Sequence, residues 1–178
     1  RMAVTGGDDN RAIIWDIATG ERVQTLSGHT SWVLGAVFST DRQTVFTVSW
    51  DLGVARWDIE TGQQLQTYFA EGIQLHTLAV SSDNTILVAG GSNNPDIVVW
   101  DIASRELLRR LVGHNSFVTD LAISPDRSRV LSGSWDATMI LWDLATGDLI
   151  QQFRGHTGVV FSVNFSPNGQ RALTGRVI

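Results

Sequence analysis

Residues 113–143 read GHNSFVTDLAISPDRSRVLSGSWDATMILWD, and this stretch decides the fold. It opens with Gly-His, continues as short apolar runs separated by turn-forming residues, and closes with Trp142-Asp143. β-Branched and aromatic residues between such turns are typical of short antiparallel strands. The turn at Ser124–Arg127 and the turn at Asp136–Thr138 separate three of them. Because no part of the stretch keeps a helical period, it predicts an all-β structure.

The same pattern returns along the whole chain. Trp-Asp pairs begin at Trp15, Trp57, Trp100 and Trp142, at spacings of 42, 43 and 42 residues. Gly-His pairs begin at Gly28, Gly113 and Gly155, at spacings of 85 and 42 residues. A fixed period of this length indicates a repeat architecture, and four strands of about five residues with their connections fill it. A single four-stranded sheet buries only one face, so successive sheets are expected to stack.

Composition excludes several other functions. The 178 residues include no cysteine, which rules out disulfides and thiolate metal sites and fits a reducing, cytoplasmic compartment. A net charge of −5 argues against nucleic acid as a partner. No apolar run approaches the roughly 20 residues of a membrane span, so direct membrane insertion is not expected. The repeated His residues are dispersed around the sheets, and we expect neither a metal nor a cofactor.

These motifs resemble the WD-repeat β-propeller family over essentially the whole chain. The resemblance implies an all-β propeller of about four four-stranded blades. The expected limits are a blade part at 1–27, blades at 28–70, 71–112 and 113–154, and a blade part at 155–178. Because the spacings make Met2 equivalent to Arg171, residues 171–178 repeat the strand that residues 2–9 supply. We therefore expect a segment of a larger propeller, of seven blades or so, whose remaining blades come from this or another chain. A closed four-blade ring with a frayed tail is the alternative.

The resemblance also implies a side-chain network in each blade. It joins the His of Gly-His, a Ser or Thr of the second strand, the Asp of the next turn and the Trp. Two blades match in full, with His29, Ser49, Asp51 and Trp57 in one and His114, Ser134, Asp136 and Trp142 in the other. The remaining members are Asp9 and Trp15, then Ser92 and Trp100, and finally His156. Gly7 stands at the Ser position of the first blade part, and Glu71 replaces His in the third repeat, which we expect to be the least stable complete blade.

Three Trp residues lie outside the Trp-Asp pairs, namely Trp32, Trp50 and Trp135. Trp50 and Trp135 precede the turn Asp of two blades, while Trp32, Phe117 and Val159 stand where the first strand starts. The resemblance places these positions on the top rim, where large aromatic residues are the usual anchors of protein recognition. His76 and Phe161 follow as surface contacts of the first strand. Packing of the Trp side chains across neighbouring blades is the alternative, and His76 is otherwise a plain exposed or a titrating residue.

The expected function is a non-catalytic scaffold that binds partner proteins or peptides through this rim. The alternative is a structural subunit or C-terminal sensor region permanently docked in a larger assembly. A hydrolase is disfavoured, because the His, Ser and Asp of each blade are expected to satisfy one another inside it.

Overall fold

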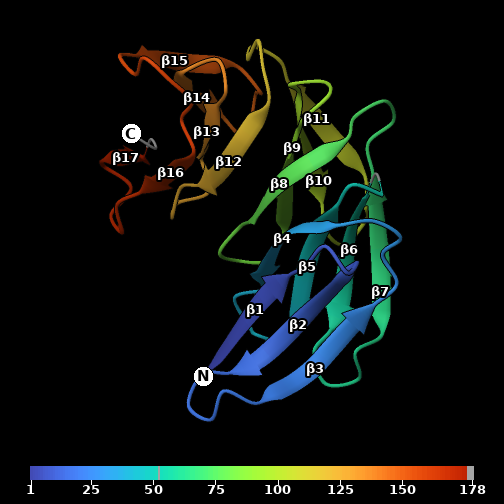
Figure 1. Cartoon of the computed structure of the whole chain (residues 1–178). Coiled ribbons are helices and arrows are strands. Elements are labelled where there is room, and N and C mark those ends of the chain that lie inside the picture. The colour runs from blue at the N-terminus through green and yellow to red at the C-terminus, as the bar shows by residue number, and fades with distance from the viewer. Residues whose placement is uncertain (52, 176–178) are drawn as a thin grey trace. The chain divides into compact units, whose positions relative to one another are not determined.

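The computed structural model describes residues 1–51 and 53–175, and within them the chain forms strands and turns only (Figure 1). The strands are β1 (Met2–Gly6), β2 (Arg11–Asp16), β3 (Arg22–Ser27), β4 (Val33–Phe38), β5 (Thr44–Ser49), β6 (Gly53–Asp58), β7 (Gln64–Phe69), β8 (Leu75–Val80), β9 (Ile86–Gly91), β10 (Ile97–Asp101), β11 (Leu107–Leu111), β12 (Val118–Ile123), β13 (Arg129–Ser134), β14 (Thr138–Asp143), β15 (Leu149–Arg154), β16 (Ser162–Phe165) and β17 (Ala172–Gly175). This described part contains no helix that could cross a membrane.

Each sheet is built from strands that follow one another in the chain. Three sheets have four strands, β4 to β7, β8 to β11 and β12 to β15, while β1 to β3 form a three-stranded sheet and β16 pairs with β17. The all-β class with four-stranded blades is thereby confirmed, as a segment of a propeller. Of the residues expected to repeat the strand of residues 2–9, β17 covers Ala172–Gly175, and residues 176–178 lie outside the described part.

The chain divides into two compact units, Arg1–His76 and Thr77–Ile178. In the first unit, apolar side chains of β1 to β3 face those of β4 to β6. Their shared core holds Ala12, Ile14, Leu26, Val33, Val45, Ala55 and Trp57, all buried. A backbone bond also joins the two sheets, since the Val33 amide donates to the Gly7 carbonyl oxygen at 3.0 Å.

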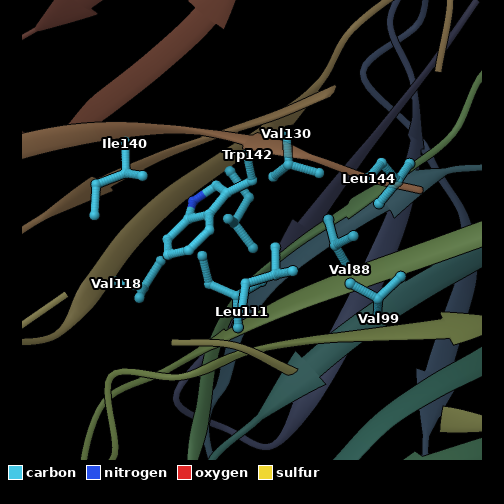
Figure 2. Close-up of a cluster of buried hydrophobic side chains, with 10 residues drawn as sticks. Val88, Val99, Leu111, Val118, Val130, Ile140, Trp142 and Leu144 are labelled. Carbon is cyan, nitrogen blue, oxygen red and sulfur yellow. The ribbon is translucent and has the colours of Figure 1, made fainter. Parts of the chain in front are cut away.

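In the second unit, the side chains between the sheet of β8 to β11 and the sheet of β12 to β15 form one core. Figure 2 shows the indole of Trp142 among Val118, Leu111 and Val130. A smaller cluster joins Leu131 and Met139 to Val160 and Val163, next to and within β16. Burial of such an indole removes roughly 150–250 Å² from water, which makes the repeated Trp a main source of cohesion between sheets.

Three of the four Trp-Asp indoles are enclosed completely. Trp57, Trp100 and Trp142 are buried, and Trp15 of the three-stranded sheet is half-buried. Each of these Trp residues lies on the third strand of its repeat, beside a register shift in the pairing with the outer strand. The spacing of the Trp-Asp pairs in the sequence is therefore also the spacing at which Trp side chains enter the cores of the sheets.

Candidate functional site

A chain of hydrogen bonds links the indole of Trp142 to the turn after β13. The Trp142 Nε1 donates to Ser132 Oγ at 2.8 Å, and Ser132 Oγ lies 2.7 Å from His114 Nε2. His114 Nδ1 lies 2.9 Å from Asp136 Oδ2. An indole N–H only donates, so the Ser132 hydroxyl accepts from it and directs its own proton to Nε2. His114 then carries its hydrogen on Nδ1, and this N–H donates a hydrogen bond to the Asp136 carboxylate.

The electrostatics of this pair favour a neutral His beside an ionised Asp. Burial lowers the pKa of His114, against the opposing pull of the Asp136 carboxylate. Burial also raises the pKa of Asp136, but hydrogen bonds from Thr138, the Asn115 amide and His114 outweigh it and leave this pKa below its ordinary value. The His therefore serves as a directional connector between polar groups that are costly to leave unpaired.

The first unit contains the same arrangement. Trp57 Nε1 donates to Thr47 Oγ1 at 2.7 Å, and Thr47 Oγ1 lies 2.6 Å from His29 Nε2. His29 Nδ1 lies 2.8 Å from Asp51 Oδ2, which also accepts the Thr30 amide at 2.9 Å. The expected His, Asp and Trp of this repeat thus meet in one chain of bonds.

The hydroxyl in this chain is not the expected one. Ser49 and Ser134 lie two residues further along the same strands than Thr47 and Ser132. Ser134 Oγ instead donates to the Ser116 carbonyl oxygen at 3.0 Å and accepts the Asp136 amide at 3.0 Å, and Ser49 makes the equivalent bonds. Residues two apart share a face of a strand, so the sequence pattern selects the face but not the level. The correct signal is a Ser or Thr ten residues before the Trp and 18 after the His.

The first and last repeats follow this corrected rule. Trp15 Nε1 donates to Thr5 Oγ1 at 2.9 Å, so Thr5, and not the position of Gly7, supplies the hydroxyl. His156 Nε2 lies 2.6 Å from Thr174 Oγ1. The expected Asp9 holds its turn, where its Oδ1 accepts the Arg11 amide at 3.2 Å.

The third repeat departs from it. Trp100 pairs with Leu87 as Trp142 pairs with Val130, which brings Ala89 to the hydroxyl position. In the same register Ser92 takes the level of Trp135, so it is not the counterpart of Ser134 that the sequence suggested. The one-residue insertion in the hairpin causes this shift, because it lengthens the turn after β9. With Glu71 at the His position, this repeat lacks both the His and the bridging hydroxyl.

The side chains of Asp136, His114 and Ser132 resemble a hydrolase triad only in the distances between them. Ser132 is completely buried, and its oxygen already accepts the Trp142 N–H. A nucleophile needs access to substrate and an oxyanion site, and a closed hydroxyl offers neither. Within the described residues no group of three or more His, Asp or Glu side chains is placed to hold a metal ion.

The Asp of each Trp-Asp pair has a role that the sequence analysis did not assign. Asp143 Oδ1 accepts the amides of Ala145 and Thr146, both at 2.8 Å. These backbone donors, with that of Thr146 foremost, lower the pKa of Asp143. Asp16, Asp58 and Asp101 cap the equivalent turns in the same way. A carboxylate followed within three residues by Thr or Ser is the signal that identifies this cap.

The exposed aromatic residues form pairs within a sheet. The rings of Trp32 and Trp50 are stacked with centroids 5.0 Å apart, and those of Phe117 and Trp135 lie 5.3 Å apart. Their exposed fractions are 49% for Trp32, 37% for Trp50, 41% for Phe117 and 53% for Trp135. A backbone bond fixes each pair, from the Trp50 amide to Trp32 and from the Trp135 amide to Phe117. In both sheets an aromatic platform therefore stands where the first strand begins.

Two more expected contact residues lie beside the platform of the second unit. The Val160 amide donates to the Ser134 carbonyl oxygen at 3.0 Å, directly before Trp135 in the chain. This bond brings Val159, which is half-buried, and Phe161, which is exposed, to the same end of the sheets. Phe117, Trp135, Val159 and Phe161 thus lie at the same end of the sheets within one unit.

His76 differs from the expected surface contact. Its side chain is half-buried, and its Nδ1 atom is enclosed without a hydrogen-bond partner among the described residues. Burial lowers the pKa of this imidazole, because the charged form loses its hydration. The ring is therefore only partly accessible, and its role as a surface contact stays a prediction.

Comparison with known proteins gives consistent matches. The profile described as "WD domain, G-beta repeat" matches residues 20–58, 105–143 and 147–176. Periodic tryptophan protein 2 of Arabidopsis thaliana is 30% identical over 136 residues, which are 76% of this chain and 15% of that protein. Guanine nucleotide-binding protein subunit beta of Nicotiana tabacum is 33% identical over 145 residues, or 76% of this chain and 38% of that protein. Ribosome biogenesis protein WDR12 homolog of Arabidopsis thaliana is 38% identical over 82 residues, or 46% and 18%. The chain spans at most 38% of the length of these relatives.

Proposed function

Because the chain belongs to the WD domain, G-beta repeat family, we propose that it is a non-catalytic scaffold that binds partner proteins or peptides through the end of its sheets that carries the exposed aromatic pairs. Proteins of this family generally bind other proteins and are generally not catalysts. The observation that carries the proposal is the recurrence of an exposed aromatic pair at the same position of two different sheets. Large, rigid aromatic surface contributes most of the energy of many protein interfaces.

Pairing of the rings still leaves surface on each residue that can contact a partner. Each ring of the Trp32–Trp50 stack covers one face of the other, and 49% of Trp32 and 37% of Trp50 stay exposed to water. The backbone bonds that fix the pairs reduce the loss of side-chain freedom on binding, which favours affinity. An isolated exposed Trp would lack this support and would lose more side-chain freedom on binding.

The test compares capture of proteins by the immobilised full chain and by its variants. Changing Trp50 and Trp135 together to Ala is expected to remove the captured proteins and to preserve the fold, because both side chains are exposed. Leu65→Ala with Ile150→Ala is the matched control, since these exposed apolar residues lie on outer strands. Undiminished capture by the Trp50→Ala Trp135→Ala variant, or an equal loss with the control, contradicts the proposal.

A second candidate is a subunit that stays docked in a larger assembly. It is favoured by an exposed aliphatic residue at the bulge of the outer strand in four sheets, namely Val23, Leu65, Leu108 and Ile150. Within each unit, exposed aliphatic residues of this kind resemble the apolar surface of obligate interfaces. If the isolated chain unfolds cooperatively and is about as stable as it is within the assembly, the scaffold is supported. If the isolated chain aggregates unless it is bound, the docked subunit is supported.

A further inference from the structure

We infer that the Trp32–Trp50 pair and the carboxylates of Asp8 and Asp9 form a recognition site for one cationic side chain, arginine or lysine, of the bound partner. The inference rests on the proposed function, since it specifies the chemistry of the segment that the scaffold binds. It concerns the unit Arg1–His76 alone.

The backbone places these four residues together. The Val33 amide donates to the Gly7 carbonyl oxygen at 3.0 Å, so Asp8 and Trp32 each stand one residue from a shared hydrogen bond. The Trp50 amide donates to the Trp32 carbonyl oxygen at 3.1 Å and brings in the second indole. Aromatic surface from one sheet therefore meets the acidic turn of the preceding sheet.

The indoles offer a site that attracts positive charge. The face of an indole carries negative potential, and a cation within about 6 Å of its centre is attracted to it. Stacking at an interplanar angle of 18° leaves an outer face on each of Trp32 and Trp50. Within residues 1–51 and 53–175 the cation–π contact is that of Arg56 over Phe46, and no Arg side chain of these residues covers the two indoles.

The neighbouring carboxylates keep their charge available. Asp8 is exposed and makes no hydrogen bond or ion pair with the described residues. Asp9 is also exposed and uses one oxygen to accept the Arg11 amide. Arg11 is the one basic residue of this turn, so the carboxylates outnumber it. The chain as a whole carries a net charge of −5, which also favours a basic partner.

The second unit supplies an internal comparison. There the equivalent backbone bond runs from Val160 to Ser134 and sets Trp135 beside Val159. Trp135 occupies the position of Asp8, and Val159 that of Trp32, so an apolar pair replaces the acidic and aromatic one. Recognition of a cation is therefore assigned to the first unit, and the second unit provides an apolar surface.

The test uses seven-residue peptides that are identical except for a central arginine, lysine, norleucine or glutamate. They are titrated into the full ¹⁵N-labelled chain while the indole N–H signals are followed. The arginine and lysine peptides are expected to shift the signals of Trp32 and Trp50 and to bind about two- to fivefold more tightly than the norleucine peptide. Added salt should weaken this preference, since both charges are exposed.

Variants separate the site from the rest of the surface. Asp8→Asn and Trp50→Ala are each expected to weaken the arginine peptide about two- to fivefold. Leu65→Ala, a change of an exposed apolar residue on β7 of the same unit, should leave that affinity unchanged. Asp8→Asn alters an exposed side chain without partners, so its melting temperature should equal that of the wild type.

Three results overturn the inference: equal binding of the norleucine and arginine peptides, no effect of Asp8→Asn, or no shift of the Trp32 and Trp50 signals at millimolar peptide. If one of these occurs while the Trp50→Ala Trp135→Ala variant still loses its captured proteins, the scaffold function stands and only the cationic chemistry fails. If that variant keeps both the capture of proteins and the binding of the arginine peptide, both proposals fail.

Discussion

The hydroxyl oxygen of Ser132 lies 2.8 Å from the indole nitrogen of Trp142, and both side chains are closed off from solvent. The same oxygen faces His114 Nε2 at 2.7 Å, so one hydroxyl satisfies two buried nitrogen atoms. A buried polar group left without a partner costs about 1–3 kcal/mol. The stability of this sheet therefore depends on one small side chain more than its size suggests.

Ser132→Ala is expected to lower the free energy of unfolding by about 1–3 kcal/mol, because it leaves Trp142 Nε1 and His114 Nε2 unpaired. Ser132→Thr is the matched control, since Thr47 performs the same task in the other unit. The threonine variant should stay within about 1 kcal/mol of the wild type. Urea unfolding followed by near-UV circular dichroism measures both, and equal losses would contradict the assigned bonds.

The stability of the chain is expected to fall in acid through His114. Its pKa is lowered in the folded state, so the neutral form contributes stability that is complete above the unfolded value of 6.5 and is lost as the pH falls through the lower folded value. The pKa of Asp136 is also lowered, so its contribution disappears only at more acidic pH, below its ordinary 3.8. His114→Asn should flatten the decline of unfolding free energy that begins near pH 6.5. If the unfolding free energy of the wild type and of the variant falls with the same slope below pH 6.5, this role of His114 is excluded. His76 is present in both proteins, so its contribution cancels in the comparison.

Trp142 and Trp135 stand seven residues apart and should respond in opposite ways to truncation. Trp142→Ala opens the core of the second unit and is expected to cost about 3–5 kcal/mol. Trp135→Ala removes an exposed ring and should cost about 1 kcal/mol or less. Thermal unfolding of the two variants checks this, and a large loss with Trp135→Ala would show that its ring is structural.

Gly90 marks a close approach between β9 and β12. A Cβ atom built there would stand 2.5 Å from Val118 Cγ1 and 2.7 Å from its Cβ. Gly90→Ala is thus expected to cost about 1–3 kcal/mol through overpacking. Gly158→Ala, where no atom lies within 4 Å of the added Cβ, is the matched control and should be nearly neutral.

Val118→Ala completes a double-mutant cycle with Gly90→Ala. Val118→Ala removes the Cγ1 methyl that the new Cβ would meet at 2.5 Å and keeps the Val118 Cβ, so the double variant should be less destabilised than the sum of the single changes. Strict additivity of the two losses, measured by denaturant unfolding, would mean that the two side chains do not compete for this space.

The sheet of β8 to β11 is expected to open more readily than the sheet of β12 to β15. It has Ala89 where Ser132 lies and Glu71 where His114 lies, so it has neither the hydroxyl nor the imidazole that link the Trp to the turn Asp in the sheet of β12 to β15. Local opening governs the exchange of backbone amides. Native-state hydrogen exchange should show faster exchange in β9 and β10 than in β13 and β14, and the reverse order would contradict this ranking.

Residues that repeat at fixed intervals could be assigned from the sequence, whereas residues whose role depends on their level along a strand could not. His29, Asp51 and Trp57 recur at fixed intervals, and the structure brings them together. Ser49 and Thr47 have hydroxyls on the same side of β5, so the sequence pattern does not distinguish them, and it is Thr47 that reaches the indole. The insertion before Trp100 misled the assignment of Ser92 for the same reason, since spacing counts residues but not hydrogen-bonded pairs.

The residue pattern was enough to predict the strands, the period of the sheets and the Trp residues that form their cores, and it singled out the aromatic residues that the structure leaves exposed. These follow from alternation, turn chemistry and repetition, which are local. The folded chain was needed to show that Trp32 stacks on Trp50, that Ser132 bridges Trp142 and His114, and that the backbone bond from Val33 to Gly7 joins the neighbours of Trp32 and Asp8. Those relations depend on the register of neighbouring strands and on backbone bonds between sheets, such as that from Val33 to Gly7, which join residues far apart in the chain.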